Sequence, residues 1–302
     1  MQQKNTCNYS DGSQLWAPRS VKATGKEVSE QLRRRGLMTD PGKDPWETRN
    51  PDAALRNSVQ TLRFASANVG TLSGKSAEVA DMLHRRRVDV AGLQEVRYRN
   101  SGAKMVKGGR YKLFWSGGPT PQGGVGVMVH ADLVKNVVEV RRVHARIIVV
   151  VVVIQDELVS ILSVYAPQCG CSAEAKDSFY DDLSMEMLKV QERCVLLGDF
   201  NGHVGKHSAG YEGVHRGFGY GRRNAEGERL LEFADSFGLK IMNTWFKKEI
   251  EKLVTYESGE HSTMIDYILV GKKGRVKDVK AIPGEEVMRQ HRIILLLLRY
   301  WL

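Results

Sequence analysis

The sequence predicts an α+β protein, a four-layer α/β sandwich in which two mixed, mostly antiparallel sheets pack face to face with helices outside. Strand-like segments recur from residue 61 onward, and helical periodicity interrupts them in three places. Of the 302 residues, 42% are hydrophobic, which is enough to bury a large core. Residues 61–302 are therefore expected to form one domain.

A different composition marks the first 60 residues. They are rich in Ser, Gly, Pro, Asn and charged residues, with ten basic and seven acidic side chains, a net charge of +3 (10 minus 7). Such a segment buries little apolar surface. We expect a flexible basic N-terminal arm over residues 1–60.

Ten segments have the composition of strands. Spacing typical of hairpins within 111–166 predicts antiparallel pairing there. The run IIVVVVVI at 147–154 is far shorter than the roughly 20 apolar residues of a membrane-spanning helix, so it indicates a strand buried on both faces. The ten segments are residues 62–69, 89–96, 111–117, 125–130, 137–143, 145–154, 158–166, 194–200, 265–270 and 292–298.

Three segments have helical periodicity, at residues 74–87, 172–191 and 224–238. The last ends at Gly238, as a helix with a glycine C-cap does. The first two separate pairs of strands, and parallel strands need such crossovers. Mixed sheets are the expected result.

The charge balance favours a polyanionic partner. Forty-five Lys and Arg stand against 35 Asp and Glu, a formal charge of +10. Such a balance suits a nucleic acid or an anionic membrane surface, and charge alone does not choose between them. Because MQQKNTCNYSDGSQ lacks the pattern of a secretory signal, we expect an intracellular protein, and a DNA substrate would place it in the nucleus. Oligomeric state stays open.

The stretch VLLGDFNGHVG, residues 195–205, ends a buried strand on two polar side chains. Asp199 and Asn201 are two residues apart, so both point to the same side of the sheet edge. They could share one substrate. The alternative is a plain turn in which Asp and Asn bond their own backbone.

Other apolar segments carry polar residues where apolar ones would be expected: Asn68, Glu95, Tyr165, Asp266 and His291. Each could singly be a capped strand end or a satisfied core group. Together they suit phosphodiester hydrolysis. A hard divalent cation takes oxygen ligands, and Glu95 and Asn68 offer a carboxylate and an amide oxygen.

The remaining groups suit the other steps of that reaction. Asp199 could accept the proton of an attacking water, and Asn201 could hold the water. Tyr165 could donate to a phosphate oxygen. A charged His291 oriented by Asp266 would stabilise the negative charge on the phosphoryl group.

The motifs ANVGTL, LQEVR, SVYAP, GDFN, HSTMIDYILV and QHR occur in that order from about Leu62 to the C-terminus. This ordered set resembles the endonuclease/exonuclease/phosphatase superfamily, which is deoxyribonuclease I-like. The sequences GEEVMRQHR and NAEGERLLEFADSFGLKIMNTWF are also similar to the endonuclease segment of non-LTR retrotransposons and to a protein derived from such a retrotransposon. The resemblance implies a four-layer sandwich and cleavage of a phosphate ester with magnesium or manganese. Together with the basic balance it favours nucleic acid, and DNA in particular, as the partner, and no membrane partner is expected.

Residue roles also follow from the resemblance. Asn68 and Glu95 match metal-side positions, and Tyr165 matches a phosphate-contacting tyrosine. Asp199 and Asn201 match the water-activating pair, and Asp266 and His291 match the aspartate–histidine pair. Asn224 falls where the family often has a polar residue near the substrate.

Two features bear on substrate and activity. Arg222 and Arg223 lie in GVHRGFGYGRRN (213–224). This segment is a candidate for a loop that approaches the backbone of a nucleic acid. The alternative is that it only connects its neighbouring elements.

The superfamily usually has Asp before the final histidine, where this chain has Gln290. The loss of a charge should weaken metal binding. An impaired, domesticated nucleic-acid-binding module is therefore one alternative, and a lipid or small-molecule phosphatase is another.

Overall fold

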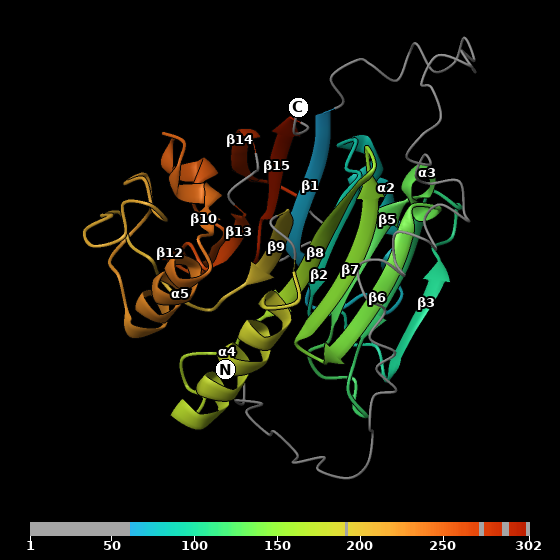
Figure 1. Ribbon diagram of the computed structural model, residues 1–302, viewed down its shortest axis with the longest axis horizontal. Helices are drawn as coiled ribbons and strands as arrows, with labels where there is room; N and C mark the ends of the chain where they lie inside the picture. The colour runs from blue at the N-terminus through green and yellow to red at the C-terminus, as the bar shows by residue number, and fades with distance from the viewer. Residues whose placement is uncertain (1–60, 191–192, 272–274, 286–289, 300–302) are drawn as a thin grey trace, which may run out of the picture.

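The computed structural model describes residues 61–190, 193–271, 275–285 and 290–299. The expected N-terminal arm over residues 1–60 lies outside them. Two large sheets pack face to face, and helices cover both outer faces (Figure 1). The predicted α+β fold, a four-layer α/β sandwich, is confirmed.

The first sheet has the strand order β14-β15-β1-β2-β5-β4-β3. β1 and β2 are parallel because helix α2 (Ser76–Arg85) connects them, and the other neighbours are antiparallel. The bounds are β1 Thr61–Asn68, β2 Val90–Gln94, β3 Ser101–Met105, β4 Tyr111–Ser116, β5 Val125–His130, β14 Arg275–Ile282 and β15 Ile293–Arg299.

The second sheet has the order β10-β13-β9-β8-β7-β6. Its one parallel pair, β8 with β9, is connected through helix α4 (Ala173–Met187). The bounds are β6 Val137–His144, β7 Ile147–Ile154, β8 Glu157–Tyr165, β9 Cys194–Asp199, β10 Lys240–Ile241 and β13 Asp266–Val270.

Smaller elements connect these strands. A short hairpin is formed by β11 (Tyr256–Ser258) and β12 (His261–Thr263). The others are helix α3 (Ala131–Val134), helix α5 (Ala225–Ser236) and the 3₁₀ turns η2 (Met242–Thr244) and η3 (Ile250–Lys252).

The run IIVVVVVI forms β7 and is buried along its whole length, as predicted. Ile148 and Val150 belong to the core between the two sheets. Ile147 and Val149 face the other way and pack in the cluster that includes Phe179 of α4. The strand can be apolar throughout because both of its faces are covered.

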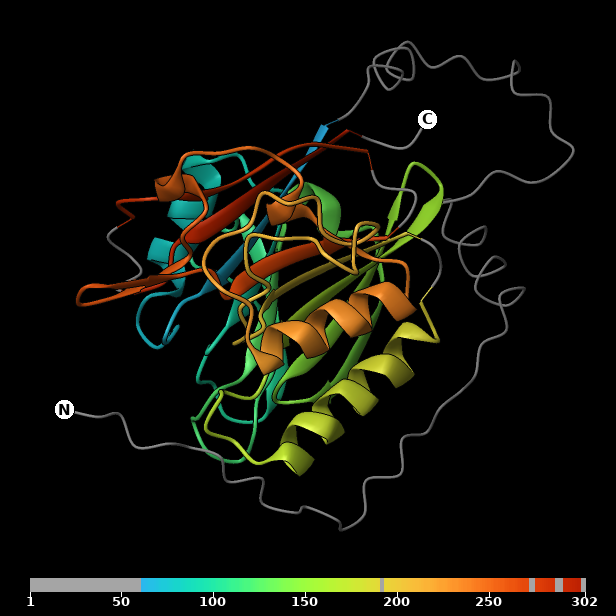
Figure 2. The ribbon, with the colours of Figure 1, turned by 90° about the vertical axis from the view of Figure 1, so that its left-hand side faces the viewer.

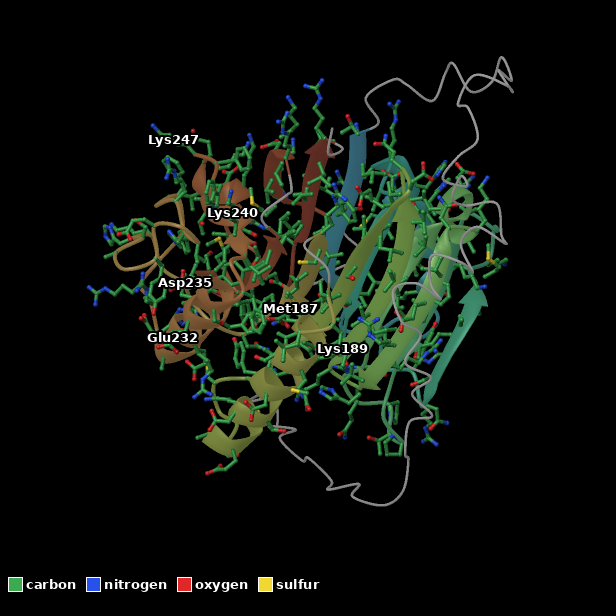
Figure 3. All side chains as sticks on the ribbon, viewed as in Figure 1. Met187, Lys189, Glu232, Asp235, Lys240 and Lys247 are labelled. Atoms are coloured by element: carbon green, nitrogen blue, oxygen red, sulfur yellow. The ribbon has the colours of Figure 1, made fainter. Side chains whose placement is uncertain are left out.

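The helices form the two outer layers. On the first sheet, α2 buries Val79, Met82 and Leu83, which recur at helical spacing. On the second, α4 and α5 run side by side (Figure 2), and the rings of Tyr180 and Phe233 lie 5.6 Å apart. Outward-facing charged side chains in this layer include Glu232 and Asp235 (Figure 3).

No helix in the described part of the chain is both long enough and apolar enough to cross a bilayer.

Candidate active site

One rim of the sandwich gathers the polar residues that end its strands. Asn68 is the last residue of β1, Tyr165 of β8 and Asp199 of β9. Asp266 begins β13, which runs antiparallel to β9, so the two aspartates face each other in register. Glu95 directly follows β2 and His291 lies shortly before β15. Strand topology thus brings together residues that are far apart in the sequence.

Asp199 lies at the centre and is 1% exposed. Its Oδ2 accepts a hydrogen bond of 3.0 Å from Asn68 Nδ2. Burial, reinforced by the nearby Asp266 carboxylate, raises the pKa of Asp199 to about 7, although His291 and Asn68 oppose the rise. A carboxylate with this pKa can accept a proton near neutral pH.

The second carboxylate oxygen of Asp199, Oδ1, accepts a hydrogen bond from the loop that follows β9. Asn201 donates its backbone N–H to Asp199 Oδ1 over 3.0 Å and its side-chain amide to the carbonyl of Ala166 over 2.9 Å. Asn201 has a φ of 49°, a left-handed conformation that Asn tolerates better than most residues. The turn expected as the alternative is therefore present, but it involves only Oδ1 of Asp199. Oδ2 of Asp199 faces Asn68.

His291 is paired with Asp266. Its Nδ1 lies 3.0 Å from Asp266 Oδ2, and its Nε2 lies 4.0 Å from Asp199 Oδ2. Burial by itself lowers the pKa of His291, but the carboxylates of Asp266, Asp199 and Glu95 outweigh it and raise the pKa to about 9. The imidazole is therefore cationic at neutral pH.

Glu95 is held by three donors. Its Oε1 accepts from Asn68 Nδ2 and from the Tyr165 hydroxyl, each over 3.1 Å, and its Oε2 accepts from Arg97 over 2.6 Å. Burial raises the pKa of Glu95, but these donors together lower it below the ordinary value. Burial and the Glu95 charge raise the pKa of Tyr165, so its hydroxyl remains a donor.

The donor set fits a hard divalent cation. The carboxylates of Glu95 and Asp199 offer oxygen ligands close together, since both accept from the one Asn68 Nδ2 donor. Asp199, Asp266 and His291 also place ligand-type atoms within 4.8 Å of one another. Both groups already have partners, because His291 Nδ1 contacts Asp266, Glu95 accepts from three donors, and the backbone N–H of Gly70 donates to Asn68 Oδ1 over 3.0 Å.

Asn224 lies at the start of α5, where its side-chain oxygen caps the helix. Its Oδ1 accepts from Gly227 N over 2.8 Å and from His203 N over 2.9 Å. The second bond fixes the chain just after Asn201. The structure therefore connects Asn224 to the site through the backbone of His203.

The two candidate arginines differ. Arg222 is exposed, whereas Arg223 pairs with Glu228, donates to the carbonyls of Val204 and His207 and lies over the ring of Tyr211. Its guanidinium thus joins the loop over 213–224 to the segment over 204–211 and to α5.

Gln290 is exposed, and its backbone carbonyl accepts from Glu257 N over 2.9 Å. This bond ties the segment before His291 to the β11–β12 hairpin. Because this hydrogen bond uses only backbone atoms, a substitution of the Gln290 side chain leaves it in place.

Three residues at the site were not identified by sequence reasoning. Arg97 pairs with Glu95, and Tyr256 places its ring 4.8 Å from that of His291. Thr255 Oγ1 accepts from the backbone N–H of Asp266 over 3.1 Å. The sequence shows Arg97 as a basic residue two positions after a predicted metal ligand, but its contact with Glu95 depends on left-handed backbone at both residues.

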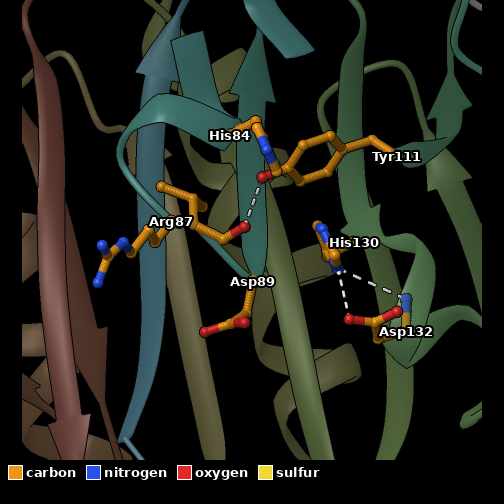
Figure 4. Close-up of a pocket in the computed structure, with 7 residues that line it drawn as sticks. His84, Arg87, Asp89, Tyr111, His130 and Asp132 are labelled. Carbon is orange, nitrogen blue, oxygen red and sulfur yellow. Dashed lines mark hydrogen bonds and ion pairs between the residues drawn. The ribbon is translucent and has the colours of Figure 1, made fainter. Parts of the chain in front are cut away.

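A cavity of about 220 Å³ lies at the opposite end of the first sheet (Figure 4). Its lining includes His84, Asp89 and His130, and Tyr111 there donates its hydroxyl to the carbonyl of Val88 over 2.6 Å. Because Asp89 precedes β2 and Glu95 follows it, the length of that strand separates the cavity from the rim.

Comparison with known proteins shows which family and which relatives the chain resembles. A family model described as Endonuclease/Exonuclease/phosphatase family matches residues 65–288. Craniofacial development protein 2 of Tragulus javanicus is 24% identical over 286 residues, which are 92% of this chain and 49% of that protein. The protein of the same name from Bos taurus is 24% identical over 84% of this chain and 44% of its own length. The chain thus spans about half the length of these curated relatives.

Solved structures share the fold. The endonuclease domain of TRAS1, a telomere-specific non-LTR retrotransposon, has a TM-score of 0.58 at 16% identity, covering 80% of this chain and 99% of that domain. The 3' phosphatase NExo from Neisseria, bound to product DNA hairpin, has a TM-score of 0.60 at 17% identity, covering 79% and 100%. The predicted superfamily is confirmed by the family model, and the likeness to a retrotransposon endonuclease domain is confirmed for the fold.

Proposed function

The chain belongs to the endonuclease/exonuclease/phosphatase family, and from that premise we propose that it is a magnesium- or manganese-dependent endonuclease acting on DNA. One observation carries the proposal. Asp199 lies between the Asp266–His291 pair and the Asn68–Glu95 pair, so a base, a cation and a metal-type donor set converge on one point.

In the proposed reaction, water attacks the phosphorus and the bond to the leaving oxygen breaks. Asp199 takes the proton of the water, which its pKa near 7 permits. His291 and Tyr165 donate to phosphate oxygens as negative charge grows on them. Asn201 positions the water.

Glu95 and Asn68 are the proposed ligands of the divalent cation. When bound, such an ion neutralises phosphate charge and stabilises the leaving alkoxide. Arg97 already occupies Oε2 of Glu95 with a positive charge. A cation arriving at Glu95 therefore competes with Arg97.

The choice of DNA rests on charge and on the relatives. A formal charge of +10 suits a polyanion better than a single small phosphate. One structural neighbour is named for its place in a retrotransposon and another for its bound DNA hairpin. We infer from the likeness to the former that the chain derives from a retrotransposon.

The test is nicking of supercoiled plasmid by the full chain with Mg²⁺, with Mn²⁺ and with chelator. Metal-dependent nicking that disappears in Asp199→Ala and His291→Ala supports the proposal. Nicking that persists in both variants overturns the site assignment.

Gln290 favours a second candidate, a nucleic-acid-binding module with little turnover. It predicts DNA binding that weakens steeply with salt in the absence of nicking. A phosphatase of lipids or small molecules is the third candidate, and inhibition of DNA binding by inositol phosphates at low concentration would favour it.

A further inference from the structure

The two sheets approach each other closely at Gly92, just beneath the candidate site. A Cβ atom added to Gly92 of β2 would lie 2.5 Å from the Cβ of Leu197 of β9. Only glycine allows this approach, since any side chain would force the sheets apart. β2 consequently packs directly against β8 and β9, whose labels lie together in Figure 1.

Because the sheets are close here, the side chain of Gln94 in the first sheet reaches hydrogen-bond partners in the second sheet. Its Nε2 donates to Ser163 Oγ of β8 and to the carbonyl of Leu197, each over 3.1 Å. Ser163 Oγ in turn donates to the carbonyl of Leu93 over 3.0 Å. Gln94 and Ser163 are both 0% exposed, so three buried hydrogen bonds join the first sheet to the second.

These bonds lie directly next to the site residues along the strands of both sheets. On β8 and β9, Ser163 pairs with Leu197 and Tyr165 pairs with Asp199. On the first sheet, Gln94 pairs with Asn68 and immediately precedes Glu95. The groups that must meet at the rim therefore lie two residues from the bridge on the second sheet and no more than one residue from it on the first.

The bridge is polar where an apolar contact would hold the sheets together equally well. The Oε1 atom of Gln94 is buried without a partner among the described residues, which is a cost. Apolar contacts are non-directional, whereas hydrogen bonds fix distance and orientation. The bridge therefore gives up stability and gains a defined position of one sheet over the other.

We propose that Gln94 is a positioning residue: through Ser163 and Leu197 it sets the separation between the Asn68–Glu95 side of the site and the Tyr165–Asp199 side. The proposal rests on the proposed function for its catalytic consequence. Its structural content, a bridge whose loss loosens the site end of the sandwich, stands independently of that function.

The test compares three variants of the full chain. Gln94→Met keeps the size of the side chain and removes its two bonds, and Ser163→Ala leaves the Gln94 bond to Leu197 in place. Tyr111→Phe is the matched control, because it removes a buried hydrogen bond at the other end of the same sheet (Figure 4).

The first measurement is amide hydrogen exchange, which needs no activity. In Gln94→Met, the amides of Val69 and Ala166, bonded at the site end, should exchange about tenfold faster, while those of Asp89 and Ser160 at the other end should hardly change. Tyr111→Phe should show the reverse pattern. Equal acceleration at both ends, or none at either, overturns the proposal.

The second measurement is nicking kinetics at a temperature where all variants are folded. Gln94→Met should lower kcat by about tenfold to a hundredfold, with KM for plasmid nearly unchanged, because misplaced groups slow the chemical step. If its kcat falls no more than that of Tyr111→Phe, Gln94 has no positioning role.

Two outcomes keep this proposal separate from the proposed function. If the natural chain does not nick DNA with any metal, the proposed function fails and hydrogen exchange alone decides the role of Gln94. If Gln94→Met does not fold, Ser163→Ala takes its place, with an expected acceleration of about threefold at the same two amides.

Discussion

The Nε2 atom of His291 lies 4.0 Å from the Oδ2 atom of Asp199, with a cationic imidazole facing a carboxylate whose pKa is near 7. Neither group has the pKa it would have in water, because each is buried and each responds to the other's charge. The pair therefore offers a proton acceptor and a proton donor at the same pH.

Replacing Asp199 by Asn should lower the nicking rate by about a thousandfold, since the side chain keeps its shape and loses its basicity. Plasmid nicking with Mg²⁺ measures this. Asp235→Asn, which changes an exposed carboxylate on α5, is the control and should be neutral. A residual rate within tenfold of the natural chain would show that Asp199 is not the base.

The rate of nicking should depend on pH with two limbs. Asp199 acts as a base only when ionised, so kcat/KM should rise as pH increases through about 7. His291 stabilises charge only when protonated, so the rate should fall as pH rises through about 9. Because the groups interact, the two midpoints belong to the cluster as a whole. His291→Gln should remove the alkaline limb and keep the acid limb.

Replacing Arg97 by Gln should tighten Mn²⁺ binding severalfold, because the guanidinium then no longer occupies Oε2 of Glu95. Electron paramagnetic resonance of free Mn²⁺, without DNA, measures the affinity. Arg99→Gln is the matched control, since it removes the same charge from an exposed position two residues away. Equal tightening in both variants would mean that only net charge matters.

Replacing Gln290 by Asp should raise both Mn²⁺ affinity and the nicking rate, because it restores a negative charge next to His291. Gln155→Asp makes the same change at an exposed turn between β7 and β8 and should have no effect. An unchanged rate in Gln290→Asp would mean that this position does not limit the enzyme.

Replacing Asn224 by Ala should cost about 1 kcal/mol of folding stability, because the cap of α5 is lost. Ser172→Ala, which removes the cap of α4, should cost a similar amount. Thermal unfolding measures both. If Asn224 also binds substrate, KM for plasmid rises in Asn224→Ala and stays unchanged in Ser172→Ala.

Most of the fold is predictable because apolar strands and periodic helices dominate it. The predicted helix over 224–238 corresponds to α5 over Ala225–Ser236, and the run at 147–154 is β7. Strand β14 was not predicted. Its register shifts between Val276 and Asp278, and this bulge breaks the alternation that marks a strand.

Strand β3 was missed for a different reason. SGAKM lies at the edge of its sheet and is mostly exposed, so it has no buried face to reveal it. The Arg97 contact could not be predicted either, because it depends on left-handed backbone at both Glu95 and Arg97. The Asp266–His291 pair was predictable as a motif, and its contact with Asp199 follows from the pairing of β13 with β9.

The place of β15 in the first sheet has a consequence for the order in which the protein matures. β15 pairs with β1 on one side and β14 on the other, and His291 lies just before it. During synthesis, Asn68, Glu95 and Asp199 leave the ribosome well before His291, and β1 can pair with β2 long before β15 is made. A nascent chain therefore carries every other group of the candidate site without the imidazole, and the site is completed only when β15 enters the sheet.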